Sequence, residues 1–228
     1  MKHDLQPLTL PAASRRAALY ALGALGTLGV VGAALLAPAR VAAQTLEAPD
    51  ALIMRVGLEV LRQIQADPVL RGGDIDRIMA LVDGQLMPHV NFRRMTASAV
   101  GRFWRQATPE QRTRLQDEFK LLLVRTYSGA LSHVTDQTLV LRPSRFTPQD
   151  TEVVVRTELR GRSEPIQIDY RLERTPQGWK VFDLNVMGIW LVDTYRNQFT
   201  TEINARGIDG LIAALTERNR AGAAAART

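Results

Sequence analysis

The side chains that most often carry chemistry are few in this chain of 228 residues. It has no cysteine and three histidines, of which His89 lies beside Pro88 and His133 follows a long helical pattern. Neither of these has a second histidine or a carboxylate at the spacing of a metal site. Without cysteine there is no thiolate ligand, thiol nucleophile or disulfide. We therefore expect no metal and no cofactor.

Motifs of nucleophilic catalysis and of phosphate binding are also missing. The sequence has no Gly-x-Ser-x-Gly, and the glycine pair at 207 and 210 is too short to cradle a phosphate; it is better explained as a break between helices. Two carboxylates that meet only in the folded protein would escape this search, so an envelope enzyme stays open as a third hypothesis. The leading expectation is that the protein is not an enzyme.

The positive charge of the chain does not indicate a nucleic-acid partner. Half of the formal net charge of +6 belongs to residues 1–43, and no RNA-binding pattern surrounds the aromatic residues. Binding to a phosphate backbone requires a concentrated basic surface, which the remaining sequence does not offer. We therefore expect no nucleic acid among the partners.

Residues 1–43 have the order of regions found in a secretory signal peptide. Arg15 and Arg16 precede an uncharged stretch over residues 17–39, and residues 41–43 offer small side chains to a signal peptidase. The stretch is long enough to be a permanent membrane anchor, but its four glycines and the cleavage site favour removal. The arginine pair also resembles a twin-arginine signal, so Sec and twin-arginine export both stay open. We expect the mature protein in the periplasm.

The first half of the mature chain has helical periodicity. Apolar residues recur at three- and four-residue steps from Asp50 onward. Asp74 is suited to cap a second helix, which Pro88 ends. Thr108 opens a capping box at the start of a long helix that we expect to end near His133.

The second half changes to a period of two and then returns to helix. Alternating residues predict strands at 139–141, 153–160, 166–173 and 179–186. Two helices are expected after them, at 191–205 and 208–219, with a break at Gly207. Short connections require an antiparallel sheet. The predicted fold is α+β, one domain over residues 44–220, in which helices cover a curved sheet of about four strands; residues 221–228 are expected to be a disordered tail.

Three stretches of the chain stand in a distinctive order. They are residues 88–92, residues 101–111 with their continuation to Tyr127, and residues 188–199 followed by 207–212. Together they resemble the MlaC-type periplasmic phospholipid-binding family, also called toluene-tolerance proteins, over about residues 48–220. Asn91 and Trp190 depart from the aspartate and the small polar residue usual at these positions, so Trp190 is a candidate to alter cavity shape or ligand choice.

The resemblance implies a carrier whose sheet and helices enclose a cavity for lipid tails. Nothing in the sequence requires more than a monomer, which is the expected state. It implies as partners an inner-membrane ABC transporter complex with a ring-forming lipid-shuttling subunit, and an outer-membrane lipoprotein–porin complex. The role would be intermembrane phospholipid transport and outer-membrane lipid asymmetry. A related branch handles hopanoids, so a hopanoid-related lipid stays open as the ligand.

Candidate cavity residues follow from the apolar faces of the predicted elements. They are Leu123, Tyr127, Leu131, Val153, Val155, Ile168, Tyr170, Val181 and Trp190. Tyr195 and Arg196 are the candidates for contact with a partner or with the cavity rim. The competing interpretation is an envelope interaction module that binds no ligand, in which the same side chains fill a solid core. Periodicity alone gives both interpretations the same residues.

Overall fold

The computed structural model describes residues 47–162 and 164–225. The expected export signal at residues 1–43 lies outside the described residues, as do residues 44–46, 163 and 226–228. In the described part of the chain, no helix is both long enough and apolar enough to cross a bilayer.

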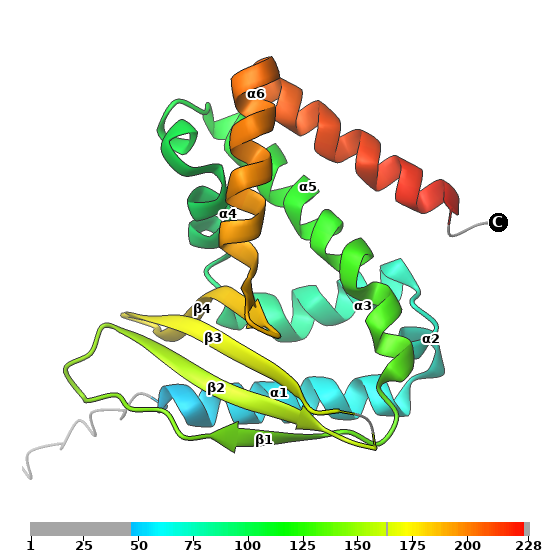
Figure 1. Ribbon diagram of the computed structural model, residues 1–228, viewed down its shortest axis with the longest axis vertical. Coiled ribbons are helices and arrows are strands. Elements are labelled where there is room, and N and C mark those ends of the chain that lie inside the picture. Colours follow the sequence, from blue (N-terminus) through cyan, green and yellow to red (C-terminus); the bar gives the residue numbers. More distant parts are fainter. Residues whose placement is uncertain (1–46, 163, 226–228) are drawn as a thin grey trace, which may run out of the picture. The chain divides into compact units, whose positions relative to one another are not determined.

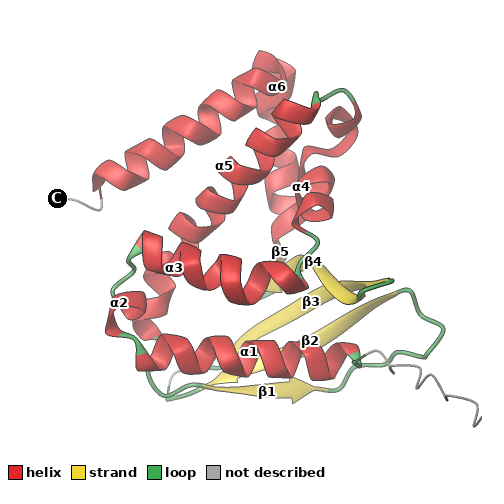
Figure 2. Ribbon diagram, turned by 180° about the vertical axis from the view of Figure 1, so that it is seen from behind, coloured by secondary structure: helices red, strands yellow, loops and turns green. Residues whose placement is uncertain are grey.

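Helix α1 (Pro49–Ala66) lies across one face of the sheet (Figure 2). Its buried residues Leu52 and Ile53 pack against strand residues such as Val155 and Leu172. The helix ends at Asp67, whose carboxylate accepts a hydrogen bond from the backbone of Val69 at 2.8 Å and so caps the short helix α2 (Pro68–Arg71).

Helix α3 (Ile75–Leu81) begins as predicted at Asp74, whose side chain accepts the backbone N–H of Arg77 at 2.8 Å. The helix changes form before Pro88. A π-helical turn, η1 (Val82–Leu86), and a 3-10 turn, η2 (Met87–His89), replace its second half. The 3-10 form has poorer hydrogen-bond geometry than α-helix, and π-helical turns are frequent at functional sites.

Helix α4 (Phe92–Val100) starts at Asn91, one of the two departures from the family pattern. The side-chain oxygen of Asn91 accepts the backbone N–H of Arg94 at 2.9 Å, and its amide nitrogen donates to Glu173 at 2.6 Å. An ionised aspartate would have no proton to donate to Glu173. Asparagine therefore caps the helix and also links it to the sheet. The 3-10 turn η3 (Gly101–Arg105) follows.

Helix α5 (Pro109–Ser128) has the predicted capping box: the Thr108 hydroxyl accepts the backbone N–H of Gln111 at 3.2 Å, and the Gln111 side chain accepts the backbone N–H of Thr108 at 3.0 Å. The predicted end at His133 was wrong for the α-helix. It stops at Ser128, and a 3-10 turn, η4 (Gly129–His133), completes the segment. Glycine is a weak helix former, which allows the change of form at Gly129.

The sheet has strand order β1-β2-β3-β4-β5 and is antiparallel throughout (Figure 1). Its strands are β1 (Thr138–Arg142), β2 (Glu152–Arg160), β3 (Ile166–Thr175), β4 (Gly178–Val186) and β5 (Ile189–Trp190). The four predicted strands are confirmed. The fifth was missed because two residues show no alternation. A break in register between Arg171 and Leu172 bends the sheet, as bulges do.

Helix α6 (Leu191–Ala225) is kinked at Gly207, which confirms the predicted break (Figure 1, orange to red). Its backbone angles there are φ 71° and ψ −176°. Residues 221–225, which we expected to be disordered, continue the helix. They are rich in alanine, the strongest helix former, and this propensity outweighs the lack of large apolar side chains.

Replacing Gly207 with alanine is expected to lower the free energy of unfolding by roughly 1–3 kcal/mol, because its backbone angles are accessible almost only to glycine. Urea unfolding monitored by circular dichroism measures the loss. Gly129→Ala is the matched control: its φ is −61° and an added Cβ meets open space, so it should be neutral or stabilising. Equal losses in both variants would contradict this account of the kink.

Three apolar clusters hold the described part of the chain together. The first joins α4, α5 and α6 around Phe119, whose ring contacts those of Phe92, Tyr195 and Phe199. The second joins α1, α2, α3, α5 and β1, and the third joins α1 to the sheet. The predicted α+β class, with helices over a curved antiparallel sheet, is confirmed.

Candidate functional site

An apolar cavity of about 270 Å³ lies where the three clusters meet. Every helical segment from α1 to η4 except α2 and η3 contributes to its wall, and β4 closes it from the sheet side. Its lining residues are Val60, Ile64, Ile78, Leu81, Val82, Leu86, Met87, Val90, Phe92, Met95, Lys120, Leu123, Val124, Tyr127, Ser128, Leu131 and Leu184.

The polar side chains of this lining are three, and two of them are bonded to groups outside the cavity. The ammonium group of Lys120 forms an ion pair with Asp83 at 2.8 Å, and the Ser128 hydroxyl donates to the carbonyl of Arg125 at 3.1 Å. The third polar residue is Tyr127. A wall made almost entirely of apolar side chains suits hydrocarbon, because a buried polar ligand would lose its hydrogen bonds there.

The cavity reaches the surface at the C-terminal end of α5. Tyr127 lines it and still has 40% of its surface exposed. Partial burial raises the pKa of the Tyr127 hydroxyl, with a smaller contribution from Tyr195, so the phenol stays neutral at physiological pH. The exposed edge of the cavity therefore carries an uncharged hydroxyl at Tyr127.

Three of the nine candidate cavity residues line this cavity: Leu123, Tyr127 and Leu131. They come from one face of α5 and its continuation η4, whose helical spacing brings them together. The other six are strand residues and lie elsewhere in this conformation. Contact with a ligand stays a prediction for all nine.

The strand candidates belong to the packed layer between α1 and the sheet or to its margins. Val153, Val155 and Val181 are buried in the third cluster, and Tyr170 packs beside it. Ile168 pairs with Val186 across β3 and β4 and is half-buried. Trp190 is stacked on the guanidinium of Arg171, 3.7 Å from ring centre to Cζ. Its partner in this structure is thus a side chain of the sheet.

Substituting Val155 with tryptophan is expected to lower the free energy of unfolding by roughly 2 kcal/mol or more, because Val155 is fully buried in that packed layer and the larger ring would overpack it. Chemical denaturation measures the loss. Val154→Trp, at the neighbouring half-buried position on the other face of β2, should cost clearly less. A Val155→Trp protein of unchanged stability would show that this layer is hollow.

The rim candidates differ in their surroundings. The Tyr195 ring is buried in the first cluster, 4.9 Å from the ring of Phe119. Arg196 is exposed; its Nε donates to the carbonyl of Ser98 at 2.9 Å and ties α6 to α4. The contacts of both residues are therefore structural, and a contact with a partner stays a prediction.

Sequence reasoning missed most of the wall. Val60 and Ile64 of α1, Ile78 and Leu81 of α3, and Leu184 of β4 all line the cavity. Their stripes were recognised as apolar faces, but a face that packs on side chains and one that borders empty space have the same periodicity. Only the spacing between the elements distinguishes the two.

Asp183 anchors the start of α6 to the sheet beside this site. It is 1% exposed, and its Oδ1 accepts the backbone N–H groups of Leu184 at 2.8 Å and Val192 at 3.1 Å. Its Oδ2 accepts from Arg171 at 2.9 Å. Burial raises the pKa of the Asp183 carboxyl above its ordinary value, while the two amides and Arg171 oppose that rise. The carboxylate of Asp183 in β4 thus accepts a backbone N–H at the start of α6, as an N-cap side chain would.

The described residues contain no group of three or more histidine, aspartate or glutamate side chains arranged to hold a metal ion. Burial lowers the pKa of His89, and the nearby cations Arg55 and Lys180 add to the effect. Its imidazole is therefore mostly neutral near pH 7 and is not among the residues that line the cavity.

Comparisons with known proteins found relatives of this chain. The model of the MlaC protein family matches residues 55–217. The chain is 21% identical over 168 residues to the intermembrane phospholipid transport system binding protein MlaC of Haemophilus influenzae, covering 72% of this chain and 78% of that protein. It is 29% identical over 109 residues to the toluene tolerance protein ttg2D of Pseudomonas putida, covering 47% of this chain and 50% of that protein.

A solved structure is similar over nearly its whole length. It is that of a phospholipid-binding protein from Ralstonia solanacearum in complex with a phospholipid. The two structures superpose with a TM-score of 0.75 and 46% sequence identity, covering 78% of this chain and 99% of the other.

Proposed function

The chain belongs to the MlaC family, and on that premise we propose that it is a periplasmic carrier, which binds the acyl chains of a phospholipid and moves the lipid between the two membranes of the envelope. One observation carries the proposal. The apolar cavity lies in a fold whose 46% identical relative is solved with a phospholipid bound.

The physical need for such a carrier is large. Each methylene group exposed to water costs about 0.8 kcal/mol. Two acyl chains of roughly 16 carbons would therefore cost more than 20 kcal/mol, which prevents free diffusion between membranes. A cavity that covers the chains removes this cost, and no catalytic step is required.

The cavity is small for a two-chain lipid. Its volume of about 270 Å³ lies below the roughly 300–1,000 Å³ of ordinary ligand pockets. A two-chain lipid needs the upper part of that range. On this proposal, loading a two-chain lipid widens the space between the three clusters.

The proposal includes the assignments that lie outside the described residues or beyond the chain itself. Residues 1–43 are the cleaved export signal, and residues 44–220 are the lipid-binding domain. The partners are an inner-membrane ABC transporter complex with a ring-forming subunit and an outer-membrane lipoprotein–porin complex. The printed name of the Haemophilus relative, a binding protein of an intermembrane phospholipid transport system, supports this role.

Extraction of the exported, purified protein with organic solvent, followed by mass spectrometry, tests the function. We expect close to one phospholipid per chain. A hopanoid in its place would assign the chain to the related lipid class. Protein that carries no lipid and takes up none from phospholipid vesicles would overturn the proposal in favour of an interaction module.

A further inference from the structure

The wall of the apolar cavity contains one weakly held segment, the π-helical turn η1. Its side chains Val82 and Leu86 line the cavity, yet none of its five residues is buried. Gly84 stands in its middle, where an added Cβ would meet open space. Glycine adds backbone freedom, and a segment with few buried side chains opens at low cost. The contacts that hold η1 in place therefore decide whether this wall is fixed.

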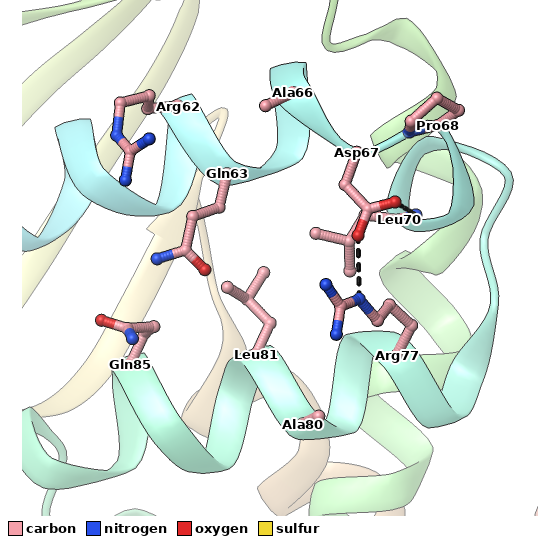
Figure 3. Close-up of a pocket in the computed structure, with 10 residues that line it drawn as sticks. All are labelled: Arg62, Gln63, Ala66, Asp67, Pro68, Leu70, Arg77, Ala80, Leu81 and Gln85. Atoms are coloured by element: carbon pink, nitrogen blue, oxygen red, sulfur yellow. Dashed lines mark hydrogen bonds and ion pairs between the residues drawn. The ribbon is translucent and has the colours of Figure 1, made fainter.

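η1 has unfilled space on its side towards α1. A polar cleft of about 450 Å³ lies between α1 and the segment formed by α3 and η1 (Figure 3). Gln85 of η1 lines this cleft opposite Gln63 of α1 (Figure 3). Among the described residues, the side chain of Gln85 has no hydrogen-bond partner. η1 thus separates the apolar cavity from the cleft and has room to move towards α1.

One ion pair joins η1 to α5 at the edge of the cavity. The Nζ of Lys120 lies 2.8 Å from the Oδ1 of Asp83. Lys120 lines the cavity and its side chain is 21% exposed, whereas that of Asp83 is 51% exposed, so the pair spans the boundary between cavity and water. In the described part of the chain, no other hydrogen bond or ion pair connects η1 with α5. The pair is therefore the polar link between these two walls.

The segments on either side of η1 are held more firmly. Before it, the carboxylate of Asp74 caps α3. After it, the carbonyl of Pro88 accepts a hydrogen bond from the ammonium group of Lys180. The backbone N–H of Asn91 donates to the carbonyl of Val181 at 2.8 Å, so both of these later bonds attach the chain to β4. η1 is thus a short stretch between two anchored ends.

We propose that η1 is a flap in the cavity wall and that the ion pair between Asp83 and Lys120 is the latch that holds it closed. This inference rests on the proposed function. When the latch opens, η1 moves into the space beside α1 and the lipid exchanges. An ion pair at a protein surface changes an equilibrium by no more than about fivefold, so it opens without unfolding the domain. The latch sets the rate of exchange.

A crosslink across the latch tests the flap, because the chain has no cysteine that would react elsewhere. Asp83→Cys with Lys120→Cys lets a short, reducible thiol crosslinker join η1 to α5. The measurement is the rate at which the purified exported protein takes up pyrene-labelled phosphatidylglycerol from vesicles. We expect the crosslink to slow uptake roughly tenfold or more, and a reducing agent to restore it. Glu59→Cys with Arg62→Cys, at an ion pair within α1, is the matched control and should keep its rate when crosslinked.

Removal of the charges tests the latch itself. Asp83→Asn and Lys120→Met should each speed uptake roughly threefold to fivefold. The double variant should be no faster than either single variant, because all three lack the same ion pair. Arg62→Met, which breaks the exposed pair with Glu59 on α1, should leave the rate unchanged.

Two results would overturn the inference. One is a crosslinked protein that takes up lipid as fast as its reduced form; the carrier function would then stand, and η1 would not be the moving wall. The other is a pair of charge variants whose effects on the rate are absent or fully additive, which would leave the flap without this latch. If the parent protein takes up no lipid and carries none, the proposed function fails and the flap fails with it. If a charge variant does not fold, the crosslinked pair decides alone.

Discussion

Leu123→Trp is expected to empty the carrier of lipid while the protein stays folded. Leu123 borders the cavity from α5 and is half-buried, so the larger ring can extend into space that a lipid chain would use. Displacing two or three methylene groups costs roughly 2 kcal/mol, which corresponds to a loss of lipid of more than tenfold. The stability of the lipid-free protein should change by less than about 1 kcal/mol, because the ring enters a hollow and not a filled core.

The measurement is the ratio of extracted phospholipid to protein, compared with the thermal midpoint after delipidation. Leu58→Trp is the matched control, since Leu58 is 45% exposed on α1 and does not line the cavity. It should keep its lipid. Full lipid content in Leu123→Trp would mean that the acyl chains lie elsewhere, and Leu131→Trp, at another lining position, gives a second reading.

Asp183→Ala is expected to lower the free energy of unfolding by roughly 3 kcal/mol, because removing one partner of a buried, hydrogen-bonded charge leaves the others unsatisfied. The backbone N–H of Val192 would lose its acceptor at the start of α6, and Arg171 would lose its bonded carboxylate. Urea unfolding gives the size of the loss, and the heat of unfolding in calorimetry checks it.

Two comparisons isolate this contribution. Asp183→Asn keeps an oxygen for the backbone amides and removes a charge whose burial is unfavourable, so it should lose less than half as much as alanine. Asp193→Ala removes an exposed carboxylate that lies 4.0 Å from the same arginine and should cost at most about 0.5 kcal/mol. Similar losses in Asp183→Ala and Asp193→Ala would rule out the capping role.

Most helices and strands could be predicted, because the sequence patterns that specify them lie within the elements themselves or next to their ends. The capping box at Thr108, the break at Gly207 and the alternation from Val153 to Arg160 each lie within a few residues of the structure they specify. The missed features depend on distant partners or on very short segments. The two-residue strand β5 has no period, and the change from α- to π-helix at Val82 carries no composition signal.

The site was harder to predict than the fold for a physical reason. Leu123, Tyr127 and Leu131 were found because one helical face holds all of them, whereas Val155 was chosen on the same grounds and lies in solid packing. Hydrophobicity reports that a side chain avoids water. It does not report whether the neighbouring volume contains protein atoms, which depends on how far α1, α3 and α5 stand from β4.

Because of the cavity where the three clusters meet, the free energy of unfolding of the protein depends on whether a lipid is bound. If the cavity scaled like an engineered core cavity, at about 24 cal/mol per Å³, leaving 270 Å³ empty would cost on the order of 6 kcal/mol, an upper bound because water can enter. A filled molecule is thus harder to unfold than an empty one. Release of the lipid loses this stabilisation, so the acceptor must bind the acyl chains more favourably than the cavity does. The lipid-free protein unfolds more often and is therefore the form that proteases and chaperones encounter most.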